Sequence, residues 1–422
     1  MSELLEQILS DENLEKALNA VKAKKGAPGV DGMTIYEIDK YLSENKELMK
    51  DKIRNRKYKP LPVRRVEIPK GDGTKRPLGI PAVKDRMIQQ AIYQVLCPMC
   101  EEMFHEHSYG FRPGRRCEDA IIKTLEYFND GYDWVVDLDL SKFFDNVDQN
   151  ILMMLVHRII KDGDTESLIR KYLQSGVNIG GNIMSTEKGT PQGGNLSPLL
   201  ANIYLHQFDL ELEARGLRFA RYADDCVICV KSEVAANRVM ASVTRWLKEK
   251  LRVEVNATKT KVARPQDIKF LGFSFYCKEG MYRPKPHIKS IERLKQKIKR
   301  ETIRSVSVSM DYRISRLNPI IRGWVNYFRI CDMKWALISF DKWMRNRVRM
   351  CIWKQWKTPH NRFKCLRKLG VSYDRAYRTA YSRKGCARCV NNPIVSFALR
   401  NEILKLKGLL FATDHFNLVH NF

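Results

Sequence analysis

Two adjacent aspartates, Asp224 and Asp225, stand between two short apolar runs at 219–222 and 226–230. Each run has the length and composition of a buried strand, so we expect a strand, a tight turn and a second strand. Carboxylates that lie side by side repel each other and shift each other's pKa, which predicts a cation close to the turn. Asp is also a favoured turn residue, so the pair alone fits an ordinary hairpin equally well.

A third carboxylate, Asp139, stands near the end of another apolar run, 134–140. It precedes Asp224 by 85 residues, which is enough chain for a crossover that lays the two strands side by side. Three carboxylates at one sheet edge suit a pair of Mg²⁺ ions about 4 Å apart, one at an attacking hydroxyl and one at a leaving pyrophosphate. The presence of Asp139 therefore favours a metal site over an ordinary hairpin turn as the interpretation of the Asp224-Asp225 pair.

Helix and strand patterns alternate around these carboxylates. Strands are expected at 64–70 and 75–81, where they form a basic hairpin around a Gly-Asp-Gly turn. Helices are expected over 10–21, 35–56, 84–104, 117–128, 149–157, 165–173 and 197–210, and the pattern from Ser290 onward is helical and basic. The mixture predicts an α+β core followed by a helical region.

The positive charge of the chain is concentrated in one region. Of the formal net charge of +27, residues 283–388 contribute 29 Lys and Arg against 6 Asp and Glu, a net of +23, which leaves 27 − 23 = +4 for the rest. Aromatic residues are threaded through this region, namely Trp324, Tyr327, Trp335, Trp343, Trp353 and Trp356. Basic charge with interleaved aromatics favours a nucleic-acid partner. A solvated basic helix face and a polybasic membrane patch are the alternatives.

Cysteine content and the lack of long apolar runs bear on the class of protein. The chain has 11 cysteines, an odd number, and its first 19 residues lack the basic-then-apolar pattern of a signal peptide. No run approaches the roughly 20 apolar residues that span a bilayer. We therefore expect an intracellular protein. Cys97, Cys100, His105 and His107 have metal-like spacing, but free cysteines in an apolar helix are usually small core residues, which disfavours zinc.

Five motifs stand in the order found in one enzyme family. They lie at 136–145 (VDLDLSKFFD), 190–194 (TPQGG), 222–225 (YADD), 271–273 (LGF) and 322–328 (RGWVNYF). The first and third resemble the palm of reverse transcriptases. The others narrow the resemblance to group II intron reverse transcriptase/maturases, with the last motif, from the maturase thumb, as the discriminating one. The resemblance runs from about residue 4 to residue 388. It implies a right-hand polymerase fold of fingers, palm and thumb.

The resemblance implies four parts of the chain. These are an N-terminal extension and fingers at 1–132, a palm at 133–282 with fingers-associated helices around 150–195, an α-helical thumb or maturase X domain at 283–358, and a basic, DNA-binding-like region at 359–422. Many relatives continue into an HNH nuclease with paired cysteines. Cys386 and Cys389 have no second pair downstream before Phe422, so we expect no such nuclease, as in the bacterial class C members.

Carried over position by position, the resemblance makes Asp139, Asp224 and Asp225 the catalytic residues and metal ligands, assisted by the backbone carbonyl of Leu140. The implied cofactor is two Mg²⁺ ions, for which Mn²⁺ is a substitute, and the implied substrate is a deoxynucleoside triphosphate.

Phe144 resembles the steric gate of the family, whose ring would collide with a ribose 2′-hydroxyl and so favour deoxynucleotides. An ordinary core phenylalanine is the alternative. The family motif places its metal ligand five residues before this aromatic, which selects Asp139 over the neighbouring Asp137 and Asp145.

Nucleotide contacts are also implied by the resemblance. Lys70 and Arg76, on opposite arms of the basic hairpin, would bind the triphosphate, unless they are a solvent-facing pair. Gln192, in the glycine-rich loop, would contact the nucleotide. Lys259 would approach the phosphates, although Lys261 could serve instead. The 271–273 motif would form the primer grip.

The favoured function is an enzyme, an RNA-directed DNA polymerase that also binds its intron RNA to assist splicing and retrohoming. The expected partners are group II intron RNA, an RNA template with a DNA or RNA primer, and a DNA target, with no membrane and with a homodimer left open. The expected location is the bacterial cytoplasm, at the nucleoid when the protein acts on DNA. The alternatives are a splicing-only RNA-binding maturase and a host-adopted reverse transcriptase in repair or defence.

Overall fold

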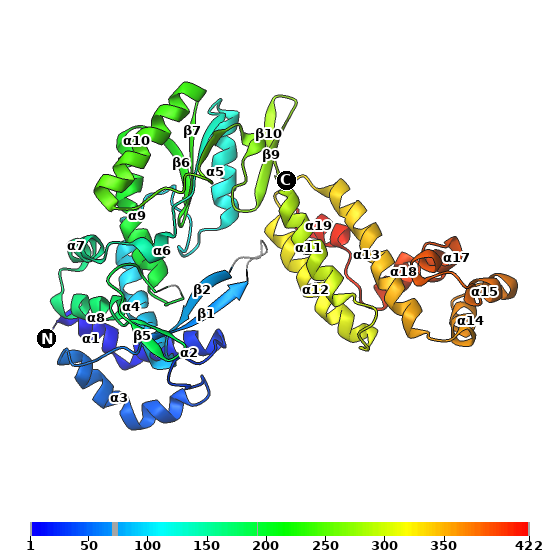
Figure 1. The fold of residues 1–422 in the computed structure, drawn as a ribbon, viewed down its shortest axis with the longest axis horizontal. Coiled ribbons are helices and arrows are strands. Elements are labelled where there is room, and N and C mark those ends of the chain that lie inside the picture. Colours follow the sequence, from blue (N-terminus) through cyan, green and yellow to red (C-terminus); the bar gives the residue numbers. More distant parts are fainter. Residues whose placement is uncertain (1, 70–74, 192, 421–422) are drawn as a thin grey trace. The chain divides into compact units, whose positions relative to one another are not determined.

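The computed structural model describes residues 2–69, 75–191 and 193–420. These residues form two compact units, Met1–Phe270 and Leu271–Phe422, each with its own core (Figure 1). The first unit mixes helices with two four-stranded sheets, and the second is mostly helical. The predicted α+β core followed by a helical region is therefore confirmed, whereas the division into four parts stays a prediction.

The first unit begins with helices that pack on one another. Its first four helices are α1 (Glu3–Leu9), α2 (Asp11–Ala23), α3 (Ile38–Arg54) and α4 (Val83–Glu101). The Ser10 hydroxyl caps α2 by accepting a hydrogen bond from the Asn13 N–H, as the sequence predicts. Leu14, Ala17 and Val21 are buried on the face of α2 that meets α4. Their helical spacing thus marks the buried face correctly.

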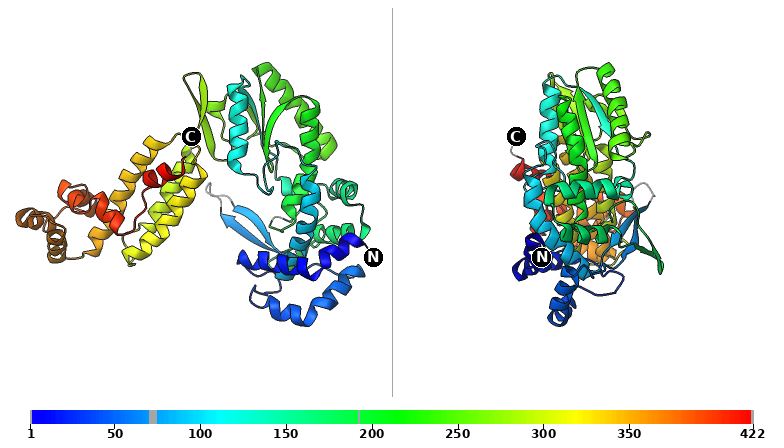
Figure 2. Two further views of the ribbon diagram at one scale, coloured as in Figure 1. Left: turned by 180° about the vertical axis from the view of Figure 1, so that it is seen from behind. Right: turned by 90° about the vertical axis from the view of Figure 1, so that its left-hand side faces the viewer.

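The sheet that carries the aspartates has the order β6-β7-β3-β8, and all its neighbours are antiparallel. Its strands are β3 (Trp134–Leu138), β6 (Arg218–Tyr222), β7 (Asp225–Val230) and β8 (Lys261–Ala263). Helix α5 (Cys117–Asn129) packs against β6 and β7, and α10 (Glu233–Leu251) packs against β3, β7 and β8 (Figures 1 and 2). Because helices cover the central strands β7 and β3, nearly every residue of these two strands is apolar.

The basic hairpin belongs to a second sheet of order β2-β1-β4-β5. Strands β1 (Val63–Pro69) and β2 (Lys75–Ile80) are antiparallel, with Pro69 opposite Lys75, and the short strands β4 (Val177–Ile179) and β5 (Asn182–Met184) extend the sheet beyond β1. The predicted hairpin is confirmed. Lys70, one of the predicted nucleotide contacts, lies outside the described residues.

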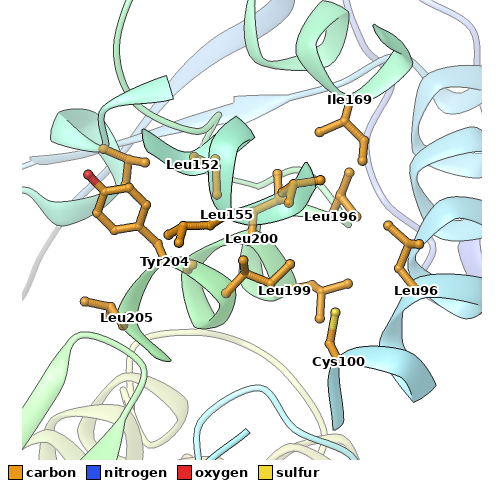
Figure 3. Close-up of a cluster of buried hydrophobic side chains, with 14 of the residues drawn as sticks. Leu96, Cys100, Leu152, Leu155, Ile169, Leu196, Leu199, Leu200, Tyr204 and Leu205 are labelled. Carbon is orange, nitrogen blue, oxygen red and sulfur yellow. The ribbon is translucent and has the colours of Figure 1, made fainter. Parts of the chain in front are cut away.

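One hydrophobic cluster joins the N-terminal helices to the aspartate sheet. It is built around α9 (Ser197–Ala214), which is buried on nearly all sides, together with α4, α6 (Phe143–Asn146), α7 (Gln149–Ile160) and α8 (Gly163–Leu173) (Figure 3). Pro198 stands in the first turn of α9, where its missing N–H has no helical partner to lose. This shared core fixes the sheet relative to the helices within the first unit.

The second unit opens with a hairpin of β9 (Phe273–Lys278) and β10 (Met281–Pro286), which follows the short helix η1 (Pro265–Asp267) of the first unit. Its helices are α11 (Ile288–Glu301), α12 (Met310–Tyr327), α13 (Lys334–Gln355), α14 (Pro359–Lys368), α15 (Tyr373–Ala380), α16 (Cys386–Val390), α17 (Pro393–Ala398), α18 (Asn401–Leu406) and α19 (Ala412–Val419). Helix α19 returns to α12 and α13, where the Asp341 carboxylate accepts the Ala412 and Thr413 N–H groups, both at 2.9 Å. No helix within the described ranges is long and apolar enough to cross a membrane.

Asp85, in the first turn of α4, is a buried carboxyl group away from the aspartate turn, with 1% of its surface exposed. It accepts hydrogen bonds from the Tyr58 hydroxyl at 2.7 Å, the Leu61 N–H at 3.1 Å and the Tyr172 hydroxyl at 3.4 Å. Burial raises the pKa of Asp85 to about 6, and these hydrogen bonds offset only part of the shift.

Asp85→Asn should flatten the pH dependence of stability between about pH 4 and pH 6. In that range the folded protein keeps a proton on Asp85 that the unfolded chain has released, so the free energy of unfolding falls as pH rises, by about 3 kcal/mol in total. Urea unfolding at several pH values checks the difference between the two proteins. Asp39→Asn, which changes an exposed carboxylate, is the control. The same slope in wild type and Asp85→Asn would contradict the account.

Candidate active site

The three predicted aspartates lie at one end of the aspartate sheet. Tyr222 and Asp225 pair across the turn, so Ala223 and Asp224 form its tip, and Ala223 adopts a left-handed φ of +58°. Strand β3 runs antiparallel beside β7 with Leu138 opposite Cys226, which brings the next residue, Asp139, to the same end as Asp225. The predicted strand, turn and strand are confirmed, and the three carboxylates are neighbours.

The pKa values of Asp224 and Asp225 are raised, mainly by desolvation. The surrounding protein raises the pKa of Asp224, and the charge on Asp139 adds to the shift. The Asp225 side chain reaches solvent, yet desolvation by the protein around the turn, followed by the charges on Asp224 and Asp139, raises its pKa to about 6. Burial likewise raises the pKa of Asp137 to about 6. At Asp225, repulsion from the other two carboxylates outweighs attraction by Lys259 and Lys269, so negative charge is in excess there.

Lys259 is a cation that contacts this group. Its Nζ lies 3.1 and 3.3 Å from the two Asp139 carboxylate oxygens. The same loop holds the Asp139 backbone, because the Asn256 N–H donates to the Asp139 carbonyl at 2.8 Å and the Thr260 hydroxyl accepts the Asp139 N–H at 3.1 Å. Lys261, the alternative left open by the sequence, instead donates to the backbone carbonyl of Asp267.

The donor set fits a hard divalent cation, because carboxylate oxygens are the ligands that Mg²⁺ and Mn²⁺ take in proteins and the charge here is in excess. As the side chains stand, with Asp139 paired to Lys259, no group of three or more His, Cys, Asp or Glu among the described residues is placed to hold an ion.

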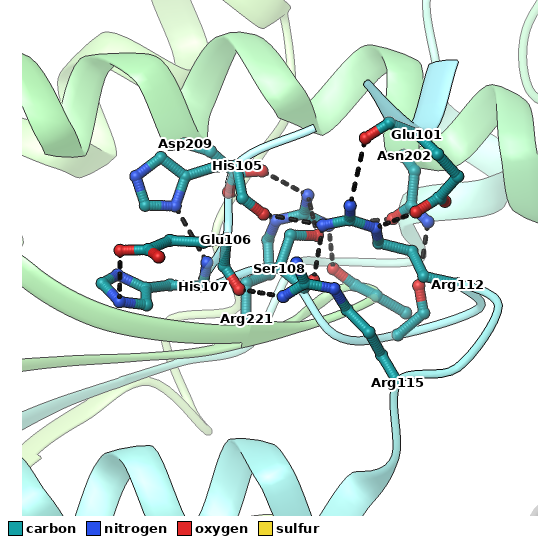
Figure 4. Close-up of polar contacts among 12 residues, drawn as sticks. Glu101, His105, Glu106, His107, Ser108, Arg112, Arg115, Asn202, Asp209 and Arg221 are labelled. Atoms are coloured by element: carbon teal, nitrogen blue, oxygen red, sulfur yellow. Dashed lines mark hydrogen bonds and ion pairs between the residues drawn. The ribbon is translucent and has the colours of Figure 1, made fainter. Parts of the chain in front are cut away.

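A buried arginine supports the turn from behind (Figure 4). Arg221, on β6, is 1% exposed, and all five of its N–H donors have acceptors. Its Nε donates to Asp209 Oδ1 at 2.6 Å, and Nη2 donates to Asp209 Oδ2 and to Ser108 Oγ, the latter at 2.8 Å. Its Nη1 donates to Asn202 Oδ1 at 3.1 Å and to the Ala223 carbonyl in the turn at 3.0 Å.

Gly110, in the loop before α5, packs closely against the same turn. The Asn202 side chain donates to the Gly110 carbonyl at 2.8 Å, and a Cβ at Gly110 would lie 2.3 Å from the Ala223 nitrogen. Only glycine allows this approach. Sequence reasoning missed this network, although an arginine inside the apolar run 218–222 and an aspartate within the apolar helix α9 were signals of a buried ion pair.

A second group of predicted residues surrounds a cavity of about 380 Å³ between the basic hairpin and α6. Its lining includes the half-buried Phe144 and the loop residue Thr190, whose Oγ1 is buried without a hydrogen-bond partner in the described structure. Three cationic residues also line it, namely Arg65, Lys142 and Lys188. A Cβ at Gly193 would lie 2.3 Å from the Gly79 carbonyl oxygen of β2, which explains the glycine in this loop.

The remaining predicted contacts are only partly described. Arg76 is exposed on β2, opposite Ile68, and its charge lowers the pKa of Asp224 against the larger effect of burial. Arg76 is therefore within electrostatic range of the turn. Gln192 lies outside the described residues.

Two other motifs meet in the second unit. The Tyr327 hydroxyl, from the 322–328 motif, donates to the Leu271 carbonyl of the 271–273 motif at 2.8 Å, and the Phe328 ring lies 4.8 Å from the Phe273 ring. The residue between them, Gly272, accepts the His287 N–H at 3.0 Å. The predicted primer grip is thus held by the first turn of α11 and the end of α12.

The cysteines of the metal-like spacing lie inside α4. Cys97 and Cys100 are free and buried, and burial raises the pKa of the Cys100 thiol to about 12. The His105 and His107 rings contact each other and Phe219 instead. These contacts are those of core residues.

Arg221→Met should destabilise the first unit by about 3–5 kcal/mol, because it leaves the Asp209 carboxylate buried without its cation. Arg218→Met, which breaks the exposed pair with Asp130 at 3.2 Å, is the matched control and should cost less than about 1 kcal/mol. The double change Arg221→Met/Asp209→Leu should recover part of the loss. Denaturant unfolding measures all three, and equal losses for the two single variants would contradict the role of this pair.

The chain matches two protein-family models. Residues 68–275 match the reverse transcriptase (RNA-dependent DNA polymerase) family, and residues 291–370 match the group II intron maturase-specific domain.

Individual relatives agree with these matches. Protein YkfC of Escherichia coli (strain K12) is 34% identical over 320 residues, which cover 66% of this chain and 84% of the relative. The group II intron-encoded protein LtrA of Lactococcus lactis subsp. cremoris is 38% identical over 200 residues, which cover 47% of this chain and 33% of LtrA. The chain thus spans most of the first relative and a third of the second.

A solved structure, the partial Cas6-RT-Cas1--Cas2 complex, is 23% identical with a TM-score of 0.39 and covers 59% of this chain and 43% of that chain, a similarity too low to support a conclusion. The family models and the extensive match to YkfC show the family. The chain belongs to the reverse transcriptases and combines an RNA-dependent DNA polymerase domain with a group II intron maturase-specific domain.

Proposed function

We propose that Asp139, Asp224 and Asp225 are the catalytic carboxylates of RNA-templated DNA synthesis in this chain. The observation that carries the proposal is their gathering at one end of a sheet, with raised pKa values on Asp224 and Asp225 and excess negative charge. Nucleotidyl transfer by reverse transcriptases depends on divalent metal ions, and an excess of carboxylate charge is what such a site requires.

In this proposal the three carboxylates, assisted by the Leu140 carbonyl, hold two Mg²⁺ ions or, as substitutes, Mn²⁺. When bound, the ions supply activation of the primer 3′-hydroxyl and stabilisation of the leaving pyrophosphate. The protein's own part is to keep the carboxylates at fixed positions. The Arg221 network does so for the turn, and the 256–260 loop does so for the Asp139 backbone.

We infer that the triphosphate of the incoming nucleotide is bound by Lys70, Arg76, Gln192 and Lys259. The electrostatic effect of Arg76 on Asp224 and the contact of Lys259 with Asp139 support two of these assignments. A lysine that pairs with Asp139 in the free protein is close enough to exchange that carboxylate for a phosphate when a cation binds. Phe144, beside the cavity, is the steric gate against a ribose 2′-hydroxyl.

The second activity is binding of group II intron RNA to assist splicing, with retrohoming into a DNA target as the outcome. The match of residues 291–370 to a maturase-specific domain and the net charge of +23 over residues 283–388 support it. A splicing-only maturase would not need the aspartates, and their buried support by Arg221 favours an enzyme. A host-adopted reverse transcriptase would share the chemistry and differ in the absence of an intron around its gene.

Asp224→Asn should lower primer extension on an RNA template by at least about a hundredfold, because it removes a charge from the reacting centre. Binding of structured RNA should be unchanged. Primer extension and filter binding on the same preparation measure both. The control is Asp39→Asn, an exposed carboxylate on α3 that should keep full extension. Primer extension by the Asp224→Asn variant at the wild-type rate would contradict the assignment of the catalytic residues.

Phe144→Val should raise the use of ribonucleotides relative to deoxynucleotides by roughly 10–100-fold, because the smaller side chain leaves room for a 2′-hydroxyl. The ratio of kcat/KM for the two nucleotides, measured on one template, reports it. Phe397→Val, at an exposed phenylalanine of the second unit, should leave the ratio unchanged. An unchanged ratio in Phe144→Val would show that Phe144 is an ordinary core residue.

A further inference from the structure

Helix α15 and its C-cap residue Tyr381 present a row of exposed aromatic rings, the tyrosine ladder Tyr373, Tyr377 and Tyr381. The three side chains follow one another at four-residue spacing and are 60%, 49% and 46% exposed. The Tyr373 and Tyr377 rings are parallel to within 4° with centroids 6.4 Å apart, and Tyr377 and Tyr381 stack at 4.6 Å. Phe363 of α14 meets the first two rings edge-on at 5.2 and 6.3 Å.

The ladder is not needed for the packing of α15. A different face of the helix buries Ala376, Thr379 and Ala380, where α15 meets α14 and α17 (Figure 1). Exposed tyrosines are tolerated singly on many proteins, because their hydroxyl groups reach water. Three stacked rings on one outer face, with a fourth ring closing one side, form instead a surface that is already arranged for planar ligands.

Positive charge surrounds the ladder. Residues 359–388 contain nine Lys and Arg and one acidic residue, Asp374. Arg375 and Arg378 are exposed on α15, and Arg383 follows Tyr381 closely. In the part of the chain that the structure describes, none of these three arginines forms an ion pair with a carboxylate. Their charge is therefore available to a polyanion.

We propose that the tyrosine ladder binds unpaired RNA, with bases stacked on its exposed rings and phosphates of the same strand held by Arg378 and neighbouring basic side chains. The nearly parallel Tyr373 and Tyr377 rings, both largely exposed, offer aromatic surface on which a base can stack. Stacking needs an exposed base face, which selects a single strand over a duplex.

The proposed partner is RNA because the ladder continues the maturase-specific region. That region ends at residue 370 and includes Phe363, whose ring contacts Tyr373 and Tyr377. The proposal rests on the RNA-binding part of the proposed function and adds to it a site that stacks unpaired bases. The site is independent of the aspartates.

The experiment titrates the full-length chain into two fluorescein-labelled strands, twelve uridines and an abasic ribose-phosphate strand of the same length, and reads anisotropy. Tyr377→Ser should weaken binding of the uridine strand roughly 5- to 100-fold, the effect of losing one base-aromatic stack, and should change binding of the abasic strand by less than about twofold. Tyr377→Phe should keep the wild-type affinity. The control Tyr36→Ser, at a tyrosine 81% exposed in the first unit, should change neither strand.

A salt series separates stacking from charge. Arg375→Gln/Arg378→Gln should reduce the slope of log affinity against log salt by about one to two for the uridine strand, whereas Tyr377→Ser should leave the slope unchanged.

Four results would overturn the proposal. One is an unchanged affinity of Tyr377→Ser for the uridine strand, and another is an equal loss on the abasic strand. The third is a loss confined to a strand of twelve deoxyuridines, labelled and titrated in the same way, which would make single-stranded DNA the partner. The fourth is altered self-association of Tyr377→Ser in sedimentation, which would make the ladder a protein interface. The titration contains no nucleoside triphosphate and no metal ion, so its result does not depend on polymerase activity. A chain without polymerase activity could still be tested for RNA binding by the ladder, and a negative binding result would not affect the assignment of the aspartates.

Discussion

The aspartate turn depends on the buried ion pair between Arg221 and Asp209. A buried guanidinium is costly unless each donor finds an acceptor, and here all five do. One of these acceptors is the Ala223 carbonyl, in a turn whose left-handed φ costs energy for a residue other than glycine. The pair thus holds the turn in a conformation that the local sequence would not adopt alone, and it connects the turn to α9 and to the core around that helix.

The same pair shapes the electrostatics in front of the turn. Because Asp209 neutralises Arg221, the arginine adds little positive charge to the turn. Desolvation, with repulsion between the carboxylates added to it, raises the pKa of Asp224 and Asp225. The cations that offset this charge are side chains on neighbouring segments, namely Arg76, Lys259 and Lys269. Rigid support behind the turn and exchangeable cations in front of it are the combination expected of a site that binds ions and phosphates during each reaction cycle.

Sequence patterns that span only a few residues predicted much of this fold. The apolar runs around the aspartates, the basic hairpin and the Ser10-capped helix appear where expected, since each depends on neighbours within a few residues. The proximity of Asp139 to Asp225 followed from strand pairing. The support by Arg221 could not be predicted, because Ser108, Asn202 and Asp209 are brought to it only by the tertiary fold. The choice of Lys259 over Lys261 beside Asp139 likewise required the path of the 256–260 loop. The catalytic and nucleotide-binding roles remain predictions.

The end of the aspartate sheet is the proposed binding site for divalent cations, on which the proposed chemistry depends. Replacing Mg²⁺ with Fe²⁺ in the presence of ascorbate and peroxide generates hydroxyl radicals at the bound ion, and these cut the chain next to it. Peptide mapping should find the cuts near residues 139 and 224–225, and excess Mg²⁺ should suppress them. Cuts confined to other segments, or cuts at these positions that Mg²⁺ does not suppress, would contradict the claim.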